Sequence, residues 1–278
     1  MSAIGKYNKL EIVKELDFGV YVFEEKLGEI LLPKRYVPEN VEAGDFIDVF
    51  IYLDSKDCLI ATTEKPFVTV GEFAYLKVLS VSDFGAFLDW GLSKDLLVPF
   101  REQKQKMAEG DHYIVYVYID EHTQRIVATS KIDKYLKGDI SKFTEGEEVD
   151  LLVANRTELG YNAIINNSNW GLIYKDEIFT DLRKGYKVKG YIKKLRPDGK
   201  IDLTLNKSGY EKVKDITEVI LDEIKNRDGF LEITDKSDPE LIYRTFEVSK
   251  KTFKKAIGSL YKDRLIIIEP AGIRLLEK

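Results

Sequence analysis

A chain of 278 residues with 44% hydrophobic content can bury substantial cores, which excludes global disorder. Its net charge of −5 excludes a protein that binds nucleic acid over its whole surface, so any attraction to phosphates must be local. One cysteine, Cys58, excludes an intramolecular disulfide, and no run of 18 apolar residues or apolar signal core occurs. We therefore expect a cytoplasmic protein with no membrane partner, in which Cys58 is a small buried hydrophobe.

The first domain is expected over residues 1–66 and is called module one. Its short runs of strand-forming residues are separated by turn residues, and no long segment of helical period interrupts them. The expected strands are Leu10–Glu15, Gly19–Glu24, Gly28–Pro33, Phe46–Leu53 and Cys58–Thr63. Gly19 is expected to permit the sharp bend that a barrel corner needs. This pattern predicts a small five-stranded barrel.

Module two, expected over residues 67–134, repeats module one at a nearly constant offset. The run Asp83–Leu88 matches Asp17–Val22, and Pro99 matches Pro33. A weaker third copy, module three, is expected over residues 143–207, where Leu159 takes the place of the first aromatic residue. The repeats predict a mainly β protein made of three tandem barrels of the OB-fold type.

Module three is rich in basic residues. Eight basic residues and a single acid, Asp198, lie between residues 183 and 200. Alternation along a strand would place Lys187, Lys189 and Tyr191 on one face and would turn Tyr186 toward the core. We expect a salt-dependent groove for a phosphate backbone here, and the alternative is a merely solvated sheet face.

The period of the apolar residues changes after residue 208. The spacing of Ile216, Ile220 and Ile224 predicts a helix over about 210–226. The elements expected after it are a strand at Phe230–Ile233, a helix from Pro239 to Phe246 capped by Asp238, a helix from Lys250 to Tyr261 capped by Ser249, and strands at Leu265–Glu269 and Ile273–Leu276. This order predicts a small α+β winged helix-turn-helix domain over residues 208–278.

Two pairs of aromatic residues could take part in binding. Phe18 and Tyr21 flank a glycine in module one, and Phe84 and Phe87 do so in module two. Unpaired bases stack on exposed rings of this kind. The alternative is that one ring of each pair lies in the barrel core.

The last long helix carries a second candidate surface. Its basic residues are Lys250, Lys251, Lys254 and Lys255. In a DNA-reading winged helix this would be the recognition helix, but base readout favours Arg, Asn or Gln, and the helix contains none. Its alternative role is packing or protein contact.

The three modules are similar to S1 domains, an RNA-binding subset of the OB-fold, most closely at Val81–Leu88 and Asp95–Val98. Three such modules followed by a winged helix resemble the bacterial conserved virulence factor B family. The resemblance implies RNA binding and a role in post-transcriptional control. It also implies that the two aromatic pairs contact RNA, together with Arg125 and Lys200 near the last turns. The histidine of S1 domains has no match, since Leu32, Val98 and Tyr174 stand there.

Enzymatic chemistry finds little support in the sequence. His112 and His122 have no second histidine or cysteine at metal-ligand spacing, and no phosphate loop or nucleophile elbow occurs. We expect a non-catalytic protein without cofactor or small-molecule substrate that binds single-stranded RNA. The alternatives are a winged-helix regulator that binds duplex DNA and a protein-binding adaptor. The expected RNA contacts are Phe18, Tyr21, Phe84, Phe87, Arg125, Tyr174, Lys187, Lys189, Tyr191, Lys193, Lys194, Arg196 and Lys200.

Overall fold

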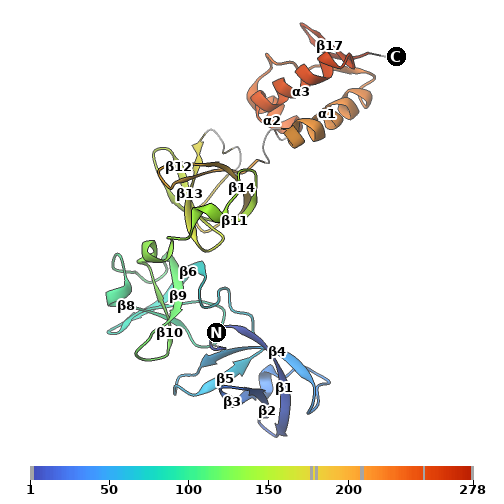
Figure 1. Cartoon of the computed structure of the whole chain (residues 1–278). Helices are drawn as coiled ribbons and strands as arrows, with labels where there is room; N and C mark the ends of the chain where they lie inside the picture. The colour runs from blue at the N-terminus through green and yellow to red at the C-terminus, as the bar shows by residue number, and fades with distance from the viewer. Residues whose placement is uncertain (1–2, 176–177, 179–180, 207–209, 247, 277–278) are drawn as a thin grey trace.

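The computed structural model describes residues 3–175, 178, 181–206, 210–246 and 248–276, apart from the side chains of residues 210–215. Three five-stranded barrels and a small α+β domain follow one another along an elongated molecule (Figure 1). The expected fold class is confirmed.

The three barrels share one strand order. Module one contains β1 (Tyr7–Leu16), β2 (Gly19–Glu24), β3 (Gly28–Pro33), β4 (Phe46–Leu53) and β5 (Leu59–Thr62). Module two contains β6 (Phe73–Ser82), β7 (Gly85–Leu88), β8 (Leu96–Pro99), β9 (His112–Ile119) and β10 (Ile126–Thr129). Module three contains β11 (Glu148–Arg156), β12 (Gly160–Ile165), β13 (Asn169–Tyr174), β14 (Lys187–Leu195) and β15 (Ile201–Thr204). In each barrel the first strand pairs with the second and the fourth, and the third pairs in parallel with the fifth.

One glycine recurs at the same corner of each barrel. Gly19, Gly85 and Gly160 begin the second strand with φ of +153°, +150° and +156°. A Cβ at any of the three would collide with a carbonyl oxygen of the third strand, which is that of Val98 in module two. The second strand can therefore bend over the third only without a side chain at this position.

Modules one and two share a hydrophobic cluster. The side chains of Phe50 and Tyr52 project from the outer face of β4 and pack against Trp90 of module two. The Phe50 and Trp90 rings meet edge to face, with centroids 5.8 Å apart. Aromatic pairs of this geometry stabilise packing beyond the area they bury. The two barrels are therefore packed directly against each other.

Modules two and three are joined by a second cluster. Phe73 and Ile114 of module two pack with Leu152 and Ile164 of module three. The side-chain oxygen of Asn167, in the β12–β13 turn, accepts a hydrogen bond from the Phe73 backbone N–H at 3.0 Å. Apolar burial and a directional hydrogen bond together fix the contact between these barrels.

The fourth strand supplies an outward aromatic residue in every barrel. Phe50 lies opposite Thr62, Tyr116 opposite Thr129 and Tyr191 opposite Thr204. Phe50 is buried by module two, and Tyr116 stacks on Tyr135 with centroids 3.8 Å apart. Tyr191 instead donates its hydroxyl to Glu148 at 3.0 Å. A polar contact thus replaces the aromatic packing at the last barrel of the series.

The C-terminal domain has the winged-helix order of elements. These are α1 (Tyr210–Lys225), β16 (Phe230–Leu231), α2 (Pro239–Phe246), α3 (Lys250–Lys262), β17 (Ile266–Glu269) and β18 (Gly272–Leu275). The expected caps are present: Asp238 accepts from the Glu240 N–H at 2.7 Å, and Ser249 accepts from the Thr252 N–H at 3.2 Å. Buried side chains of all three helices and the sheet form its core.

Two local expectations are wrong. Cys58 is exposed, because it lies in the β4–β5 turn, where its N–H bonds to the Asp54 carboxylate, and not in β5. Tyr186 is 43% exposed, because β14 begins one residue later, at Lys187. From there the predicted alternation holds: Lys187 and Lys189 are exposed and Gly190 is buried.

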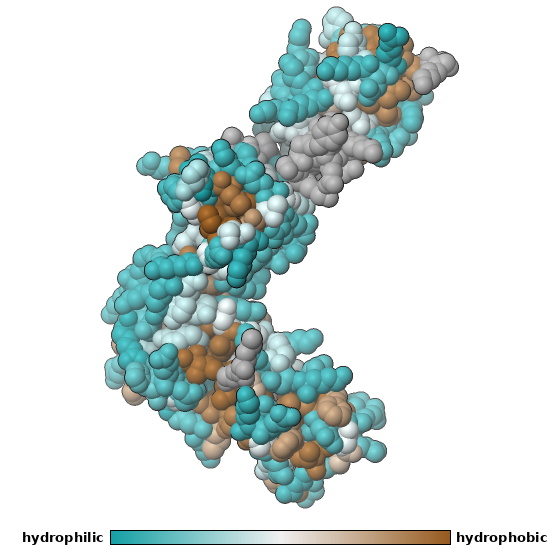
Figure 2. All heavy atoms as spheres, viewed as in Figure 1, coloured by the Kyte–Doolittle hydropathy of each residue, from teal (hydrophilic) through white to brown (hydrophobic). Residues whose placement is uncertain are grey.

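The visible outer surface is largely hydrophilic, with apolar side chains gathered in separate patches on the units (Figure 2). None of the helices that the structure describes has the length and apolar composition needed to span a bilayer.

The barrel-corner glycine gives a first prediction. Gly85→Ala would force a Cβ against the Val98 carbonyl at a left-handed φ, so we expect a loss of about 1–3 kcal/mol in the free energy of unfolding, measured in urea. Gly258→Ala in α3 is the control, because a Cβ there meets nothing and alanine favours the helix. Equal stabilities of the two variants would contradict the prediction.

Candidate nucleic-acid interface

The clearest candidate site is a cleft on module two, called the module-two cleft. Phe84 in the β6–β7 turn, Phe87 on β7, Lys94 and Arg125 line a cavity of about 230 Å³. Phe84 is 75% exposed, and Phe87 is half-buried. The cleft combines two accessible rings with two cations, which is what a single strand needs for base stacking and phosphate contact.

The local sequence explains why Phe84 projects outward. Ser82 accepts a hydrogen bond from the Phe84 N–H at 3.2 Å and so tightens the turn. Gly85 then bends the chain sharply into β7. The side chain of Phe84 therefore lies outside the barrel, while Ala86 and Leu88 of β7 face the core.

Module one forms one wall of the module-two cleft. Tyr52 and Leu53 line it, and the Lys94 ammonium donates to the carbonyls of Leu53, at 2.9 Å, and Asp54, at 2.5 Å. Burial is the main reason that the pKa of Lys94 is lowered. Arg125 forms an ion pair with Asp57 of the same module-one turn. Both cations of the cleft are thus engaged by module one.

The aromatic pair of module one is arranged like that of module two. Phe18 is 56% exposed in the β1–β2 turn, and Tyr21 on β2 is half-buried. The Lys14 ammonium lies 5.6 Å from the centroid of the Tyr21 ring, within cation–π range. In modules one and two, therefore, the first ring of the pair is open to solvent and the second is partly covered.

Module three has no aromatic pair at this place. Leu159, which is 61% exposed, takes the place of the first ring. Arg196 lies in the β14–β15 turn, where it donates to Asp202 at 3.0 Å and to the Tyr174 hydroxyl at 2.5 Å. The expected contacts Tyr174 and Arg196 are therefore close together, bound to a largely buried carboxylate.

The basic run of module three extends along β14 and into the turn that follows it. Lys187 and Lys189 begin β14 and line a cavity of about 720 Å³ between modules two and three. Arg196 and Lys200 lie beyond the other end of this nine-residue strand. Lys187 and Lys189 are thus the first group of the expected cations, and Arg196 and Lys200 are a second group past the end of the strand, with Lys193 and Lys194 between them.

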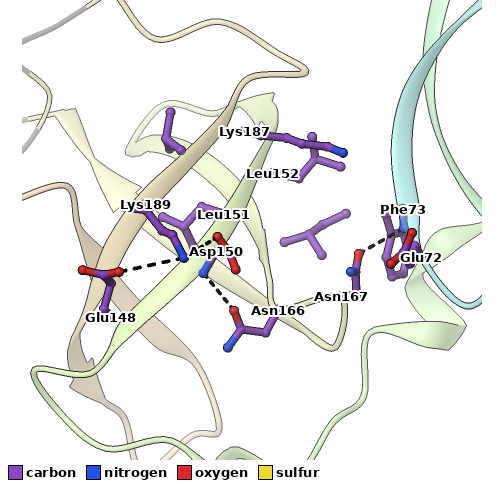
Figure 3. A pocket seen from close by; sticks show the side chains of 12 residues that line it. Glu72, Phe73, Glu148, Asp150, Leu151, Leu152, Asn166, Asn167, Lys187 and Lys189 are labelled. Atoms are coloured by element: carbon purple, nitrogen blue, oxygen red, sulfur yellow. Dashed lines mark hydrogen bonds and ion pairs between the residues drawn. The ribbon is translucent and has the colours of Figure 1, made fainter. Parts of the chain in front are cut away.

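Carboxylates and amides surround the first group. Lys189 lies 2.8 Å from Asp150 and 3.8 Å from Glu148, and its hydrogen bond to Asp150 is the main reason that its pKa is raised. Lys187 extends from β14 toward the module-two wall, where Glu72 lies (Figure 3). Three acids and two lysines line this cavity, so its charge does not favour phosphate.

The remaining expected residues of module three are at the surface. Lys193 and Lys194 are exposed on the second half of β14, and Lys200 pairs with Asp198 at 3.1 Å. Tyr191 is half-buried beside Glu148. An exposed ion pair of this kind is weak and can be exchanged for a phosphate contact.

Two of the lysines of α3 contact the connection that leads from β16 to α2. Lys250 donates to the Ser237 carbonyl at 2.8 Å, and Lys254 pairs with Asp235 at 3.2 Å. Lys251 and Lys255 are exposed. Two of the four lysines are therefore held against the connection between β16 and α2, and Lys251 and Lys255 are exposed to solvent.

Two residues at the candidate site had no signal in the repeat pattern. Lys94 and Asp57 lie in connections between strands, where the two modules have no matching landmark. Their importance comes from the contact between modules, because each reaches across to the other barrel.

Closed barrels with exposed rings, followed by a winged helix, define a modular protein built from nucleic-acid-binding domain classes. The S1 domain family model matches residues 4–64 and 70–131, and the CvfB-like winged helix domain model matches residues 218–275. The chain therefore contains S1 domains and a CvfB-like winged helix domain, and it is similar to conserved virulence factor B proteins, as the sequence resemblance predicted.

Curated relatives are similar over nearly the full chain. Conserved virulence factor B of Staphylococcus epidermidis is 28% identical over 99% of this chain and 95% of its own. The uncharacterized protein YitL of Bacillus subtilis is 28% identical over 93% of this chain and 89% of its own. A crystal structure of a multidomain protein with nucleic acid binding domains from Streptococcus pneumoniae aligns over 99% of both chains, with 24% identity and a TM-score of 0.42.

The β9–β10 turn beside the cleft gives a prediction on pH. The pKa of Asp120 is lowered, first by the hydrogen bond from the Thr123 backbone N–H and also by Arg101 nearby. Because the folded pKa lies below the unfolded value of about 3.9, this stabilisation is present above the unfolded pKa. It is lost as the pH falls through the folded pKa.

Asp120→Asn keeps one acceptor oxygen but removes the charge. We expect it to lower the thermal unfolding midpoint at neutral pH and to flatten the fall of that midpoint below about pH 4. Thermal scans of both proteins between neutral pH and about pH 3 measure this. Parallel curves with a constant separation would show that the Asp120 charge is not responsible.

Proposed function

We propose that this protein is a non-catalytic, cytoplasmic RNA-binding protein that holds single-stranded RNA and acts in post-transcriptional control. The observation that carries the proposal is that Phe84 and Phe87 line the same cavity as Lys94 and Arg125. Rings and cations on one barrel face suit an unpaired strand, whose bases can stack while its phosphates meet the cations.

The other modules extend this track in the proposal. Phe18 and Tyr21 offer module one a matching stacking platform beside Lys14. In module three, Arg196 and Lys200 offer phosphate contacts near Tyr174. RNA is favoured over duplex DNA here because splayed single-stranded bases, and not paired ones, can reach such rings.

The module-two cleft can be tested directly. Phe84→Ala combined with Phe87→Ala should weaken the binding of single-stranded RNA about ten- to a hundredfold, because each stacked base contributes about 1–3 kcal/mol. Fluorescence anisotropy over a salt series measures this. The thermal midpoint should change little, since Phe84 is exposed and Phe87 is only half-buried.

Phe46→Ala is the matched control. This ring is 60% exposed on module one but does not line the cleft, so its loss should leave RNA affinity unchanged. Unchanged RNA binding by the double variant would remove module two from the proposed track. A collapse of its stability would show instead that the rings support the barrel.

A duplex-DNA regulator is the second candidate function, favoured by the lysines on α3. Replacing Lys250, Lys251 and Lys254 with Glu should then abolish a preference for duplex DNA over single-stranded RNA in the same assay. We expect no such preference in the native protein, because α3 has no Arg, Asn or Gln to read bases. No affinity for either nucleic acid at low salt would favour a protein-binding adaptor.

A further inference from the structure

The β4–β5 turn of module one reaches over the module-two cleft. The turn spans residues 54–58, between the ends of β4 and β5. It makes two contacts across the module boundary: Lys94 donates to carbonyl oxygens at its start, and Arg125 pairs with Asp57 near its end. These are the two cations of the cleft, so the contacts fall on the groups that phosphate would need.

The turn is organised to present Asp57. The Asp54 carboxylate accepts from the N–H groups of Lys56, at 2.8 Å, and Cys58, at 2.9 Å, which closes the turn. Asp57 itself has a φ of +60°, a conformation that Asp and Asn tolerate better than most residues. The carboxylate therefore meets Arg125 from a turn fixed by its own hydrogen bonds.

The contact between Asp57 and Arg125 is one that water can reach. The two side chains are 43% and 50% exposed. Exposed ion pairs contribute little to stability, so a polyanion can exchange with one. Phe84, at 75% exposure, stays accessible while the pair is closed, so a base can stack before the phosphate arrives.

We propose that Asp57 is an internal competitor for RNA: its carboxylate occupies Arg125, and an RNA phosphate binds there only by displacing the turn of module one. This inference rests on the proposed function of the module-two cleft. It makes the junction of modules one and two the element that sets the affinity and salt dependence of that cleft.

Asp57→Asn is the variant that tests the competitor. Asparagine keeps the shape of the turn and tolerates the left-handed φ, but it carries no charge. We expect single-stranded RNA to bind about three- to tenfold more tightly at low salt. The slope of the logarithm of affinity against that of salt concentration should steepen by about one unit, because one more free cation meets the phosphates.

Asp48→Asn is the matched control for net charge. Asp48 lies exposed on β4 of the same module and does not line the module-two cleft. It should leave affinity and slope close to those of the native protein. Equal gains in RNA affinity by Asp57→Asn and Asp48→Asn would contradict the proposal that Asp57 competes with RNA, because the effect would then be one of overall charge.

A second background separates this proposal from the proposed function. Asp57→Asn introduced into the Phe84→Ala, Phe87→Ala protein should give a smaller gain, because the competing phosphate belongs to a strand held on those rings. If the native protein binds RNA through these rings but Asp57→Asn gives no gain, the competitor is wrong and the RNA site stands. If the ring variant binds RNA as the native protein does, the site in the cleft fails, and with it the inference.

Discussion

The structure depends on the close approach of the second and third strands at one corner of each barrel. Gly19, Gly85 and Gly160 hold a backbone conformation that side chains rarely adopt, and a Cβ at each would meet a carbonyl oxygen. The same bend closes the barrel and leaves the residue before it outside. Phe18 and Phe84 occupy that position, so the geometry that completes the fold also presents the rings.

The second organising feature is the outer face of the fourth strand. Phe50 is buried against module two, and Tyr116 packs within the cluster that joins modules two and three. Tyr191, at the equivalent position of module three, donates its hydroxyl to the Glu148 carboxylate, so the outer face of the last barrel is polar here. In repeat proteins a polar outer face similarly ends the stack, since an apolar one would invite another copy.

Internal pairing governs the electrostatics of this acidic protein. Arg125 meets Asp57, Lys189 meets Asp150 and Arg196 meets Asp202. A binding phosphate would therefore exchange with a carboxylate at these places, and not simply add to a bare cation. In the proposed function, attraction for a polyanion would therefore be local, and base stacking on the exposed rings would add a contribution that salt does not screen.

The sequence alone determined the barrels and the winged helix, because the 66-residue offset and the strand alternation can be read from the chain itself, whereas it left open which aromatic rings face outward. Local pattern also correctly predicted the Ser249 cap. It failed where the outcome depends on contacts between distant segments. Only the packing of modules one and two brings Asp57 to Arg125, and only the pairing of β11 with β14 brings Asp150 to Lys189. A sequence records which charges exist, whereas the tertiary structure decides which of them meet.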